Sequence, residues 1–152
     1  MALGASPILA AAESHALALG RFDRVNRHEP KSAPGNGLSA AIWVQSIRPV
    51  AAASGLDSTT ARLELSVRVY LGMLHEPQDE IDTLILEAVD ALMAAYSGDF
   101  ELGGLVRDVD LLGEHGDPLA ADAGYLEQDK KIYRVMVVTL PLLVNDLWSQ
   151  AP

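Results

Sequence analysis

The sequence predicts a single α+β domain in which helices pack against a sheet, and two periodic segments carry this prediction. Residues 61–71 read ARLELSVRVYL and place an apolar side chain at every second position, which is typical of a strand with one buried and one solvated face. From Ile81 to Tyr96 the apolar positions recur every three or four residues, as in a long amphipathic helix. Such a helix buries its apolar stripe on the apolar face of a sheet.

The N-terminal segment is expected to form a helix and not an export signal. It is apolar, but it has no basic start, and Glu13 and His15 interrupt the apolar part. Ser6 is the expected N-cap and Pro7 the first helical residue, while Gly20 supplies the left-handed stop. The packing stripe of this helix consists largely of small side chains, namely Ile8, Leu9, Ala12, Ala16 and Leu19.

The remaining strands are expected in the segments 22–28, 38–47, 105–112, 125–127 and 132–140. The last segment is apolar on both faces at its centre, which is typical of a central strand, and Pro141 is expected to end it. Gly103 and Gly104 are expected to mark a bulge or a close backbone approach. These strands and residues 61–71 form a mixed, mostly antiparallel sheet flanked by the N-terminal helix and the long helix.

The long helix is expected to start at the turn around Glu76 and Pro77 and to end at Gly98. Its first turns are rich in carboxylates, each of which the helix dipole favours by about 0.3–1 kcal/mol. Three long connections, 29–37, 49–60 and 113–124, are rich in Gly, Pro, Ser and Ala and are expected to be loops.

Length and composition limit the possible classes of protein. At 152 residues the chain matches one ordinary domain, so residues 1–152 are expected to fold as one unit. The net charge of −10 disfavours DNA binding by the protein as a whole. No cysteine is present, which excludes disulfides, Cys-ligated zinc and thiol catalysis. No segment has the roughly 20 uninterrupted apolar residues of a membrane span, so no membrane partner is expected.

No sequence motif indicates catalysis or a cofactor. The four histidines are scattered and are expected to be exposed or capping side chains. The densest polar cluster lacks the ordered oxygen ligands of a Ca²⁺-binding EF-hand loop. It consists of Asp108, Asp110, Glu114, His115 and Asp117. The expectation is therefore a protein without enzymatic activity, bound metal or cofactor.

A cluster of basic residues points to a partner. Arg21, Arg24, Arg27 and Lys31 fall within one short segment of a net acidic chain. They are interpreted either as charges that protect an edge strand, or as an arm that contacts an acidic neighbouring protein or, less favoured, DNA.

Apolar residues outside the main stripe of the long helix form a second such feature. They are expected either to bury against a neighbouring subunit or to belong to a wide core. The set consists of Leu86, Met93, Leu142, Leu143, Leu147 and Trp148.

Four sequence segments together span nearly the whole chain, and each corresponds to a structural element and not to a catalytic motif. They are GRFDRVNRHEPKSAPGNGLSAAIWVQSI, STTARLELSVRVY, EPQDEIDTLILEAVDALMAAYSGDFELGG and YRVMVVTLPLLVNDLW. As a set they resemble the tail terminator proteins of long-tailed phages that infect actinobacteria. The resemblance implies a mixed sheet flanked by helices, with long loops at the faces of a ring.

What the resemblance further implies is a structural virion protein that forms a homohexameric ring on the head-proximal end of the tail. Such a ring stops polymerisation of the major tail tube protein, docks the neck or head-completion protein, and lets DNA pass through its lumen without specific binding. The protein would reside in the virion tail, after assembly in the host cytoplasm. The loops 29–37, 49–60 and 113–124 are expected to contact tube and neck.

Charge suggests which residues serve each surface. An acidic lumen repels phosphates, and the expected channel-lining residues are Asp108, Asp110, Glu114 and Asp117. The residues expected at partner interfaces are Arg24, Arg27, Lys31, Leu86, Met93, Leu147 and Trp148.

Two alternative functions stay open from the sequence. A head–tail joining or neck protein of the same particle would share ring symmetry and related sheet-and-helix subunits. A small cytosolic ligand-binding domain would need an apolar pocket with convergent polar groups, which the sequence does not identify.

Overall fold

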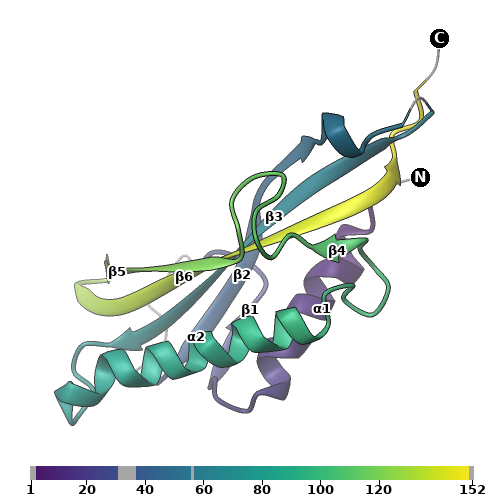
Figure 1. Cartoon of the computed structure of the whole chain (residues 1–152). Coiled ribbons are helices and arrows are strands. Elements are labelled where there is room, and N and C mark those ends of the chain that lie inside the picture. Colours follow the sequence, from purple (N-terminus) through teal and green to yellow (C-terminus); the bar gives the residue numbers. More distant parts are fainter. Residues whose placement is uncertain (1–2, 31–36, 56, 151–152) are drawn as a thin grey trace.

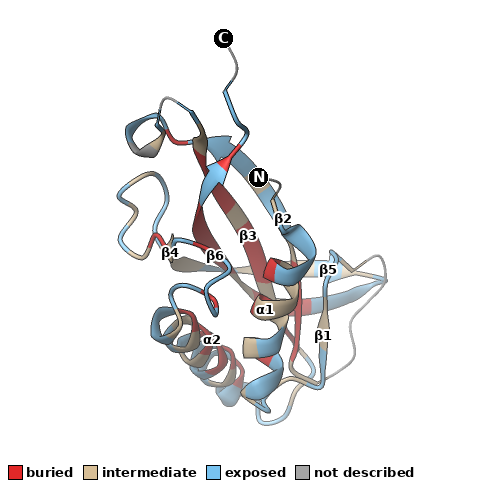
Figure 2. Cartoon of the chain, turned by 90° about the vertical axis from the view of Figure 1, so that its right-hand side faces the viewer, coloured by how far each residue is buried: buried red, intermediate tan, exposed pale blue. Residues whose placement is uncertain are grey.

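Two helices cover one side of a strongly curled sheet (Figure 1). The structure is a computed structural model that describes residues 3–30, 37–55 and 57–150. Seen from the side, the sheet bends into a half-barrel instead of lying flat (Figure 2). The predicted α+β class is confirmed, with an N-terminal helix, one long helix and a mixed, mostly antiparallel sheet.

The elements follow the predicted order, although several bounds differ. The helices are α1 (Ala5–Ala18) and α2 (Ile81–Gly98), with short 3₁₀ turns η1 (Ala51–Ala53) and η2 (Gln78–Glu80). The strands are β1 (Arg24–Asn26), β2 (Ser39–Pro49), β3 (Thr59–Gly72), β4 (Asp108–Val109), β5 (Ala120–Gln128) and β6 (Lys131–Leu147). Within the described residues, no helix combines the length and the apolar character that crossing a membrane requires.

The sheet is ordered β1-β2-β3-β6-β4, and β5 also pairs with β6. Among the described strands, β1 and β2 run parallel, and the other neighbouring pairs run antiparallel. The predicted central position of the strand at 132–140 is confirmed, because β6 has β3 on one side and both β5 and β4 on the other.

The two faces of the sheet differ as the alternation in β3 predicts. On the face toward the helices, Leu65 lies opposite Leu140 and Val67 opposite Val138, and all four side chains are fully buried. The opposite face, here called the open face, carries the alternate residues. Its buried cluster contains Ala41, Tyr70, Tyr133 and Val135. Because the sheet curls, β3 buries side chains on both of its faces.

The helices pack on the sheet through the predicted stripes. Tyr96 of α2 is fully buried, and its hydroxyl donates a hydrogen bond to the carbonyl oxygen of Ala12 in α1 at 3.0 Å. Burial raises the pKa of Tyr96, so this hydroxyl keeps its proton and acts as a donor. The small side chains of Ala12 and Ala16 allow this close approach. The buried α2 residues are Ile81, Ile85, Ala88, Val89, Leu92 and Tyr96.

Two predicted helix and strand ends are wrong. Ser6 is not the N-cap, because α1 begins at Ala5 after Gly4 and no side chain caps it. Pro141 does not end the last strand: it lies opposite Glu64 within the β3–β6 ladder, and its carbonyl accepts the N–H of Asp110 at 2.9 Å. Proline is tolerated at this position because residue 141 bonds to the segment after β4 through its carbonyl oxygen, so the missing N–H is not required. Gly20 does take the predicted left-handed conformation, with φ of 65°.

The segment after α2 is less regular than predicted. The strand predicted at 105–112 shrinks to the two residues of β4, and the loop predicted at 113–124 ends earlier, since β5 starts at Ala120. Gly103 and Gly104 lie in a turn, with φ of 66° and 88°, and a Cβ added at either glycine would meet no atom within 4 Å. The predicted strand at 22–28 is limited to β1, and residues 31–36 of the predicted loop lie outside the described residues.

Substitution Leu65→Ala should lower the free energy of unfolding by about 3 kcal/mol, since it removes buried apolar contacts and leaves a cavity in the centre of β3. The matched control is Leu74→Ala, because Leu74 is 89% exposed and its truncation should change stability by less than about 0.5 kcal/mol. Urea unfolding followed by circular dichroism measures both. Equal losses for the two variants would contradict the described core.

Candidate functional site

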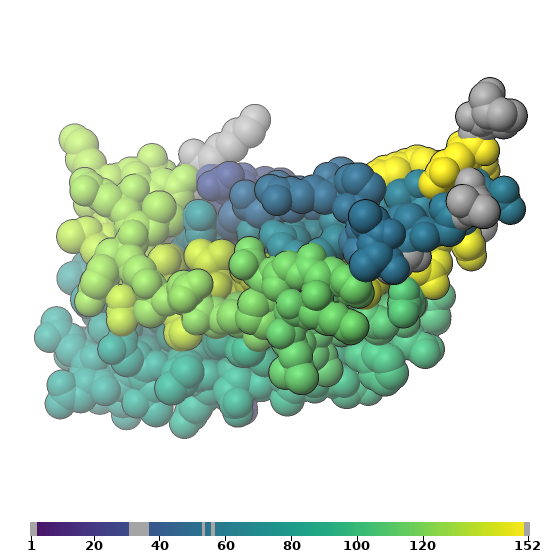
Figure 3. Space-filling model, turned by 45° about the horizontal axis from the view of Figure 1, so that its top comes forward, coloured from purple at the N-terminus to yellow at the C-terminus, as the bar shows by residue number. Residues whose placement is uncertain are grey.

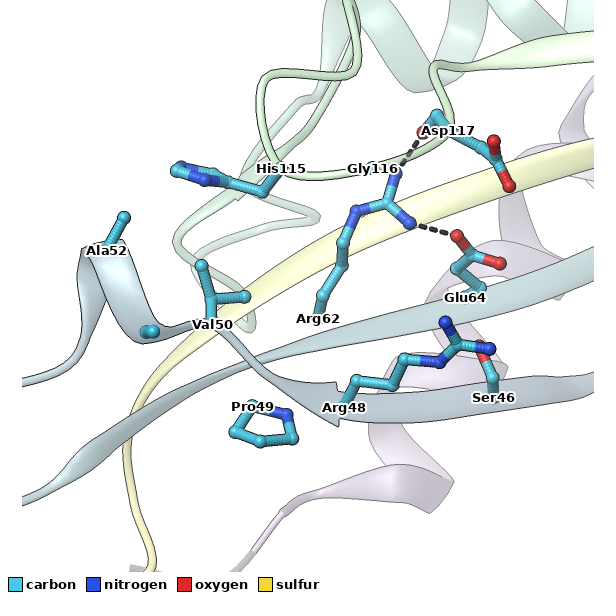
Figure 4. Close-up of a pocket in the computed structure, with 11 residues that line it drawn as sticks. Ser46, Arg48, Pro49, Val50, Ala52, Arg62, Glu64, His115, Gly116 and Asp117 are labelled. Carbon is cyan, nitrogen blue, oxygen red and sulfur yellow. Dashed lines mark hydrogen bonds and ion pairs between the residues drawn. The ribbon is translucent and has the colours of Figure 1, made fainter.

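A hollow of about 450 Å³ opens on the open face, where the end of β2 meets the loop that follows β4. The outside view shows this loop, residues 111–119, lying against the segment around residue 50 (Figure 3). The wall of the hollow includes ionisable side chains from three segments of the chain (Figure 4). They are Arg48 of β2, Arg62 and Glu64 of β3, and His115 and Asp117 of the loop.

Arg62 is the centre of this site. Its side chain is only 7% exposed, which is unusual for a guanidinium and requires that its donors be satisfied. Nε donates to the carboxylate of Asp110 at 3.3 Å, Nη1 to the carboxylate of Glu64, and Nη2 to the backbone oxygen of Asp117. The last two contacts are drawn in Figure 4. We call Arg62, Glu64, Asp110 and the backbone of Asp117 the Arg62 cluster.

The β-sheet register brings the Arg62 cluster together. Arg62 lies opposite Leu143 of β6, and Asp108 of β4 pairs with the same Leu143 from the other side. Asp110 directly follows β4 and lies two positions after Asp108, so its side chain returns to the open face beside Arg62. Gly116 then passes so close to the guanidinium that a Cβ on this glycine would lie 2.7 Å from Cζ of Arg62. A side chain at position 116 would therefore have to displace the guanidinium of Arg62 from its present position.

Asp110 also fixes the loop itself. Its carboxylate accepts the backbone N–H groups of Glu114 at 2.8 Å and His115 at 3.0 Å. Burial alone would raise the pKa of Asp110, but these two N–H donors and Arg62 outweigh it and hold the pKa below the ordinary 3.8. Asp110 is thus ionised at neutral pH and joins the sheet to the loop.

Asp108 has the opposite shift. Partial burial raises its pKa, the neighbouring Arg107 opposes this, and the carboxylates of Asp110 and Glu114 add to the rise. The pKa values of the two aspartates therefore shift in opposite directions because backbone donors and Arg62 outweigh the effect of burial at Asp110, whereas burial prevails at Asp108.

The contacts of the Arg62 cluster hold the loop after β4 against the sheet. Three of the five N–H groups of Arg62 donate to Asp110, Glu64 and Asp117. Within the described residues, no group of His, Asp and Glu side chains is arranged to hold a metal ion. Arg48 is exposed at the rim, and no ion pair is found for it among the described residues. The hollow therefore presents an exposed Arg48 beside a buried Arg62 that is already held by acceptors of the protein itself.

The residues predicted to line a channel separate into two groups. Asp110 is 5% exposed and belongs to the interior of the chain, so it offers no surface to a lumen. Glu114 and Asp117 are exposed, and Asp108 is half-buried. For these three residues a position along a channel stays a prediction.

The basic residues predicted to contact a partner lie along the β1 edge of the sheet. Arg24 and Arg27 are exposed, and Nε of Arg27 lies 3.3 Å from a carboxylate oxygen of Glu13 in α1. Lys31 lies outside the described residues. The position of β1 at a sheet edge agrees with the interpretation of these charges as edge protection.

The predicted apolar interface is also divided. Leu86 is 57% exposed and Trp148 45% exposed, as an interface residue requires. Leu147 is fully buried, and Leu142 and Leu143 are buried as well, because β6 continues past Pro141 and carries all three into the sheet. The alternative of a wide core is therefore confirmed for these three leucines, and the interface position predicted for Leu147 is wrong. Met93 is half-buried and packs against the core.

Sequence reasoning missed the two most exposed leucines. Leu74 is 89% exposed in the turn after β3, and Leu112 is 93% exposed at the start of the loop after β4. Leu74 lies outside every predicted element, and Leu112 is the last residue of the strand predicted at 105–112, which the structure shortens to β4. Arg62 was missed as well, because a charged residue on the polar face of an alternating strand is normally solvated.

The fold and the Arg62 cluster define this chain as an α+β domain with a helix-backed, half-barrel sheet and a loop held by a buried ion-pair network. No protein-family model matches the sequence, and no curated protein matches it either.

Substitution Asp110→Asn should lower stability by about 3 kcal/mol near neutral pH, because it leaves the buried Arg62 short of a charged partner. Because the folded-state pKa lies below 3.8, the stabilisation by the carboxylate is fully present above that value and is lost as the pH falls through the folded-state pKa. The difference between wild type and variant should therefore shrink in acid. Urea unfolding over a pH series measures it.

The matched control is Asp108→Asn. Because the pKa of Asp108 is raised, this side chain favours folding more in acid than at neutral pH, so the variant should lose relative stability in acid. A difference for Asp110→Asn that stays constant down to strongly acidic pH would contradict the assigned ion pair.

Proposed function

We propose that this chain is a structural virion protein that forms a ring on the head-proximal end of a phage tail tube. The ring stops further polymerisation of tube subunits, offers a docking surface to the neck, and encloses a channel for DNA. No covalent chemistry is required of the subunit in this role. Its requirements are surfaces for ring neighbours, for the tube and for the neck.

The resemblance to tail terminators supports this proposal, and the structure agrees with its coarse expectation. The four sequence segments on which the resemblance rests correspond, in order, to β1 and β2, to β3, to α2, and to β6. These elements form a mixed sheet with a helix on one face, which is the arrangement expected of such a subunit.

The observation that carries the proposal furthest is the distribution of exposed apolar side chains. Leu74 and Ile132, 89% and 54% exposed, lie at one end of the long strands, where Gly72 pairs with Tyr133. Trp148, 45% exposed, lies at the other end, just after the pair of Thr59 and Leu147. Apolar groups at both ends suit a subunit placed between two different neighbours along the tail axis.

The exposed acids suit a channel. Glu114 and Asp117 project from a loop that Asp110 and Arg62 hold in place. Carboxylates held on a fixed loop repel the phosphates of passing DNA without binding them. We assign Asp108, Glu114 and Asp117 to this role and remove Asp110 from it, since Asp110 is buried.

Particles assembled without this protein test the proposal. Loss of the ring should give tails of uncontrolled length and heads without tails, because nothing then stops tube polymerisation or docks the neck. Negative-stain electron microscopy of the mutant lysate measures tail length directly. Tails of normal length without heads would indicate a neck protein instead, and particles indistinguishable from wild type would contradict both roles.

A further inference from the structure

The sheet ends in two edges that no described strand covers. β1 pairs only with Ser39–Ala41 of β2, so the outer side of β2 from Ile42 to Pro49 has no described strand beside it. On the opposite edge, β5 pairs with β6 along its whole length and with no other described strand. Uncovered edges of this kind are sites where another strand can add to a sheet.

The side chains at both edges are also exposed. None of the nine residues of β5 is buried, although the strand belongs to a folded sheet. On β2, Val44 is 46% exposed and Ile47 is 39% exposed, although both point toward the helix side of the sheet. Two strands of high exposure at opposite edges indicate that each lacks a neighbour.

The two edges carry opposite charge. The edge formed by β1 and the outer part of β2 has Arg24 and Arg48 and no acid within either stretch. The β5 edge has Asp122 and Glu127 and no base within the strand. No ion pair involves any of these four side chains among the described residues.

The strand directions make the edges compatible. Successive antiparallel pairings from β2 to β3, β6 and β5 leave β2 and β5 running in opposite directions. If a second copy is placed beside the first by rotation about an axis along the strands, its β5 meets β2 of the first copy as an antiparallel pair. The register of β2 against β3 shifts between Val44 and Ser46, so a strand added to the β2 edge would pair regularly with the residues on one side of Gln45.

We infer that the β2 edge of one subunit pairs with the β5 edge of the next subunit, so that copies of this chain join head to tail through a continuous sheet. This inference deepens the proposed function and rests on it for the closure of the ring. A head-to-tail contact generates a closed ring when its rotation closes.

Symmetric pairing is disfavoured by the same charges. A two-fold contact between two β5 edges would bring together two edges that each carry Asp122 and Glu127, and a two-fold contact between two β2 edges would bring together two edges that each carry Arg48. Like charges directly opposite each other destabilise strand pairs.

Cross-linking tests the assigned faces, and the absence of native cysteine makes it specific. Single variants Val44→Cys and Ala123→Cys place a thiol on the β2 and β5 edges, and Ala94→Cys on the exposed surface of α2 is the matched control. With a flexible bis-maleimide, mixed Val44→Cys and Ala123→Cys chains should give cross-linked dimers. Each variant alone, or mixed with Ala94→Cys, should give background levels.

The double variant Val44→Cys/Ala123→Cys should give a ladder of oligomers that ends at the closed ring. Cross-linking of either single variant with itself would indicate a two-fold contact and overturn the inference. Background levels in the mixed sample, at concentrations where oligomers are seen by mass photometry, would overturn it as well. So would a protein that neither oligomerises nor cross-links at any accessible concentration.

Charge reversal gives an independent test in the folded protein. Arg24→Glu/Arg48→Glu should weaken self-association by about tenfold or more, and so should Asp122→Lys/Glu127→Lys. An equal mixture of the two variants should recover association, because acidic β2 edges then meet basic β5 edges and the reverse. No recovery in the mixture would overturn the assigned pairing.

The inference and the proposed function can fail separately. Closed rings that cross-link through other positions would overturn the inference and leave the proposed function intact. Cross-links between β2 and β5 in a protein whose loss leaves tail length normal would support the inference and contradict the proposed function.

Discussion

The ladder between β3 and β6 is the constraint on which the rest of the structure depends. It runs from the pair of Thr59 and Leu147 to the pair of Gly72 and Tyr133, so it fixes which residues face the helices and which face the open side. A shift of one residue would move the apolar set of β3 to the open face and bring Arg62 under α2. Burial of the helices and the position of the Arg62 cluster therefore follow from one register.

The β3–β6 register places the charged side chain of Arg62 on the open face, where the protein must supply acceptors for it. The loop after β4 covers Arg62, and a buried guanidinium is stable only when acceptors surround it. Glu64 on the same strand supplies one acceptor, while Asp110 and the backbone of Asp117 come from the segment after α2. The cluster thereby holds a loop of little regular structure and fixes its exposed acids on the surface.

Periodicity predicted the elements whose burial alternates regularly. It identified β3, the stripe of α2 and the hairpin of β5 and β6, because local spacing decides these. Periodicity failed where contacts with residues distant in the sequence determine the structure. Leu147 is buried because β6 continues opposite β3. β4 is short because only two of its residues pair with β6. The Arg62 cluster was more difficult to predict than the fold, because Arg62 and Asp110 are 48 positions apart in the sequence. Without Arg62, the cluster of acids around Asp110 was interpreted as a channel surface. A buried acid beside a buried base cannot be inferred from either residue separately.

The most direct test of the central claim is an electron cryomicroscopy map of the head-proximal end of intact tails. We predict a closed ring of this chain on the last tube ring, with Glu114 and Asp117 facing the lumen and β5 of each subunit beside β2 of its neighbour. A map in which this position is occupied by another protein, with this chain absent from the particle, would contradict the account.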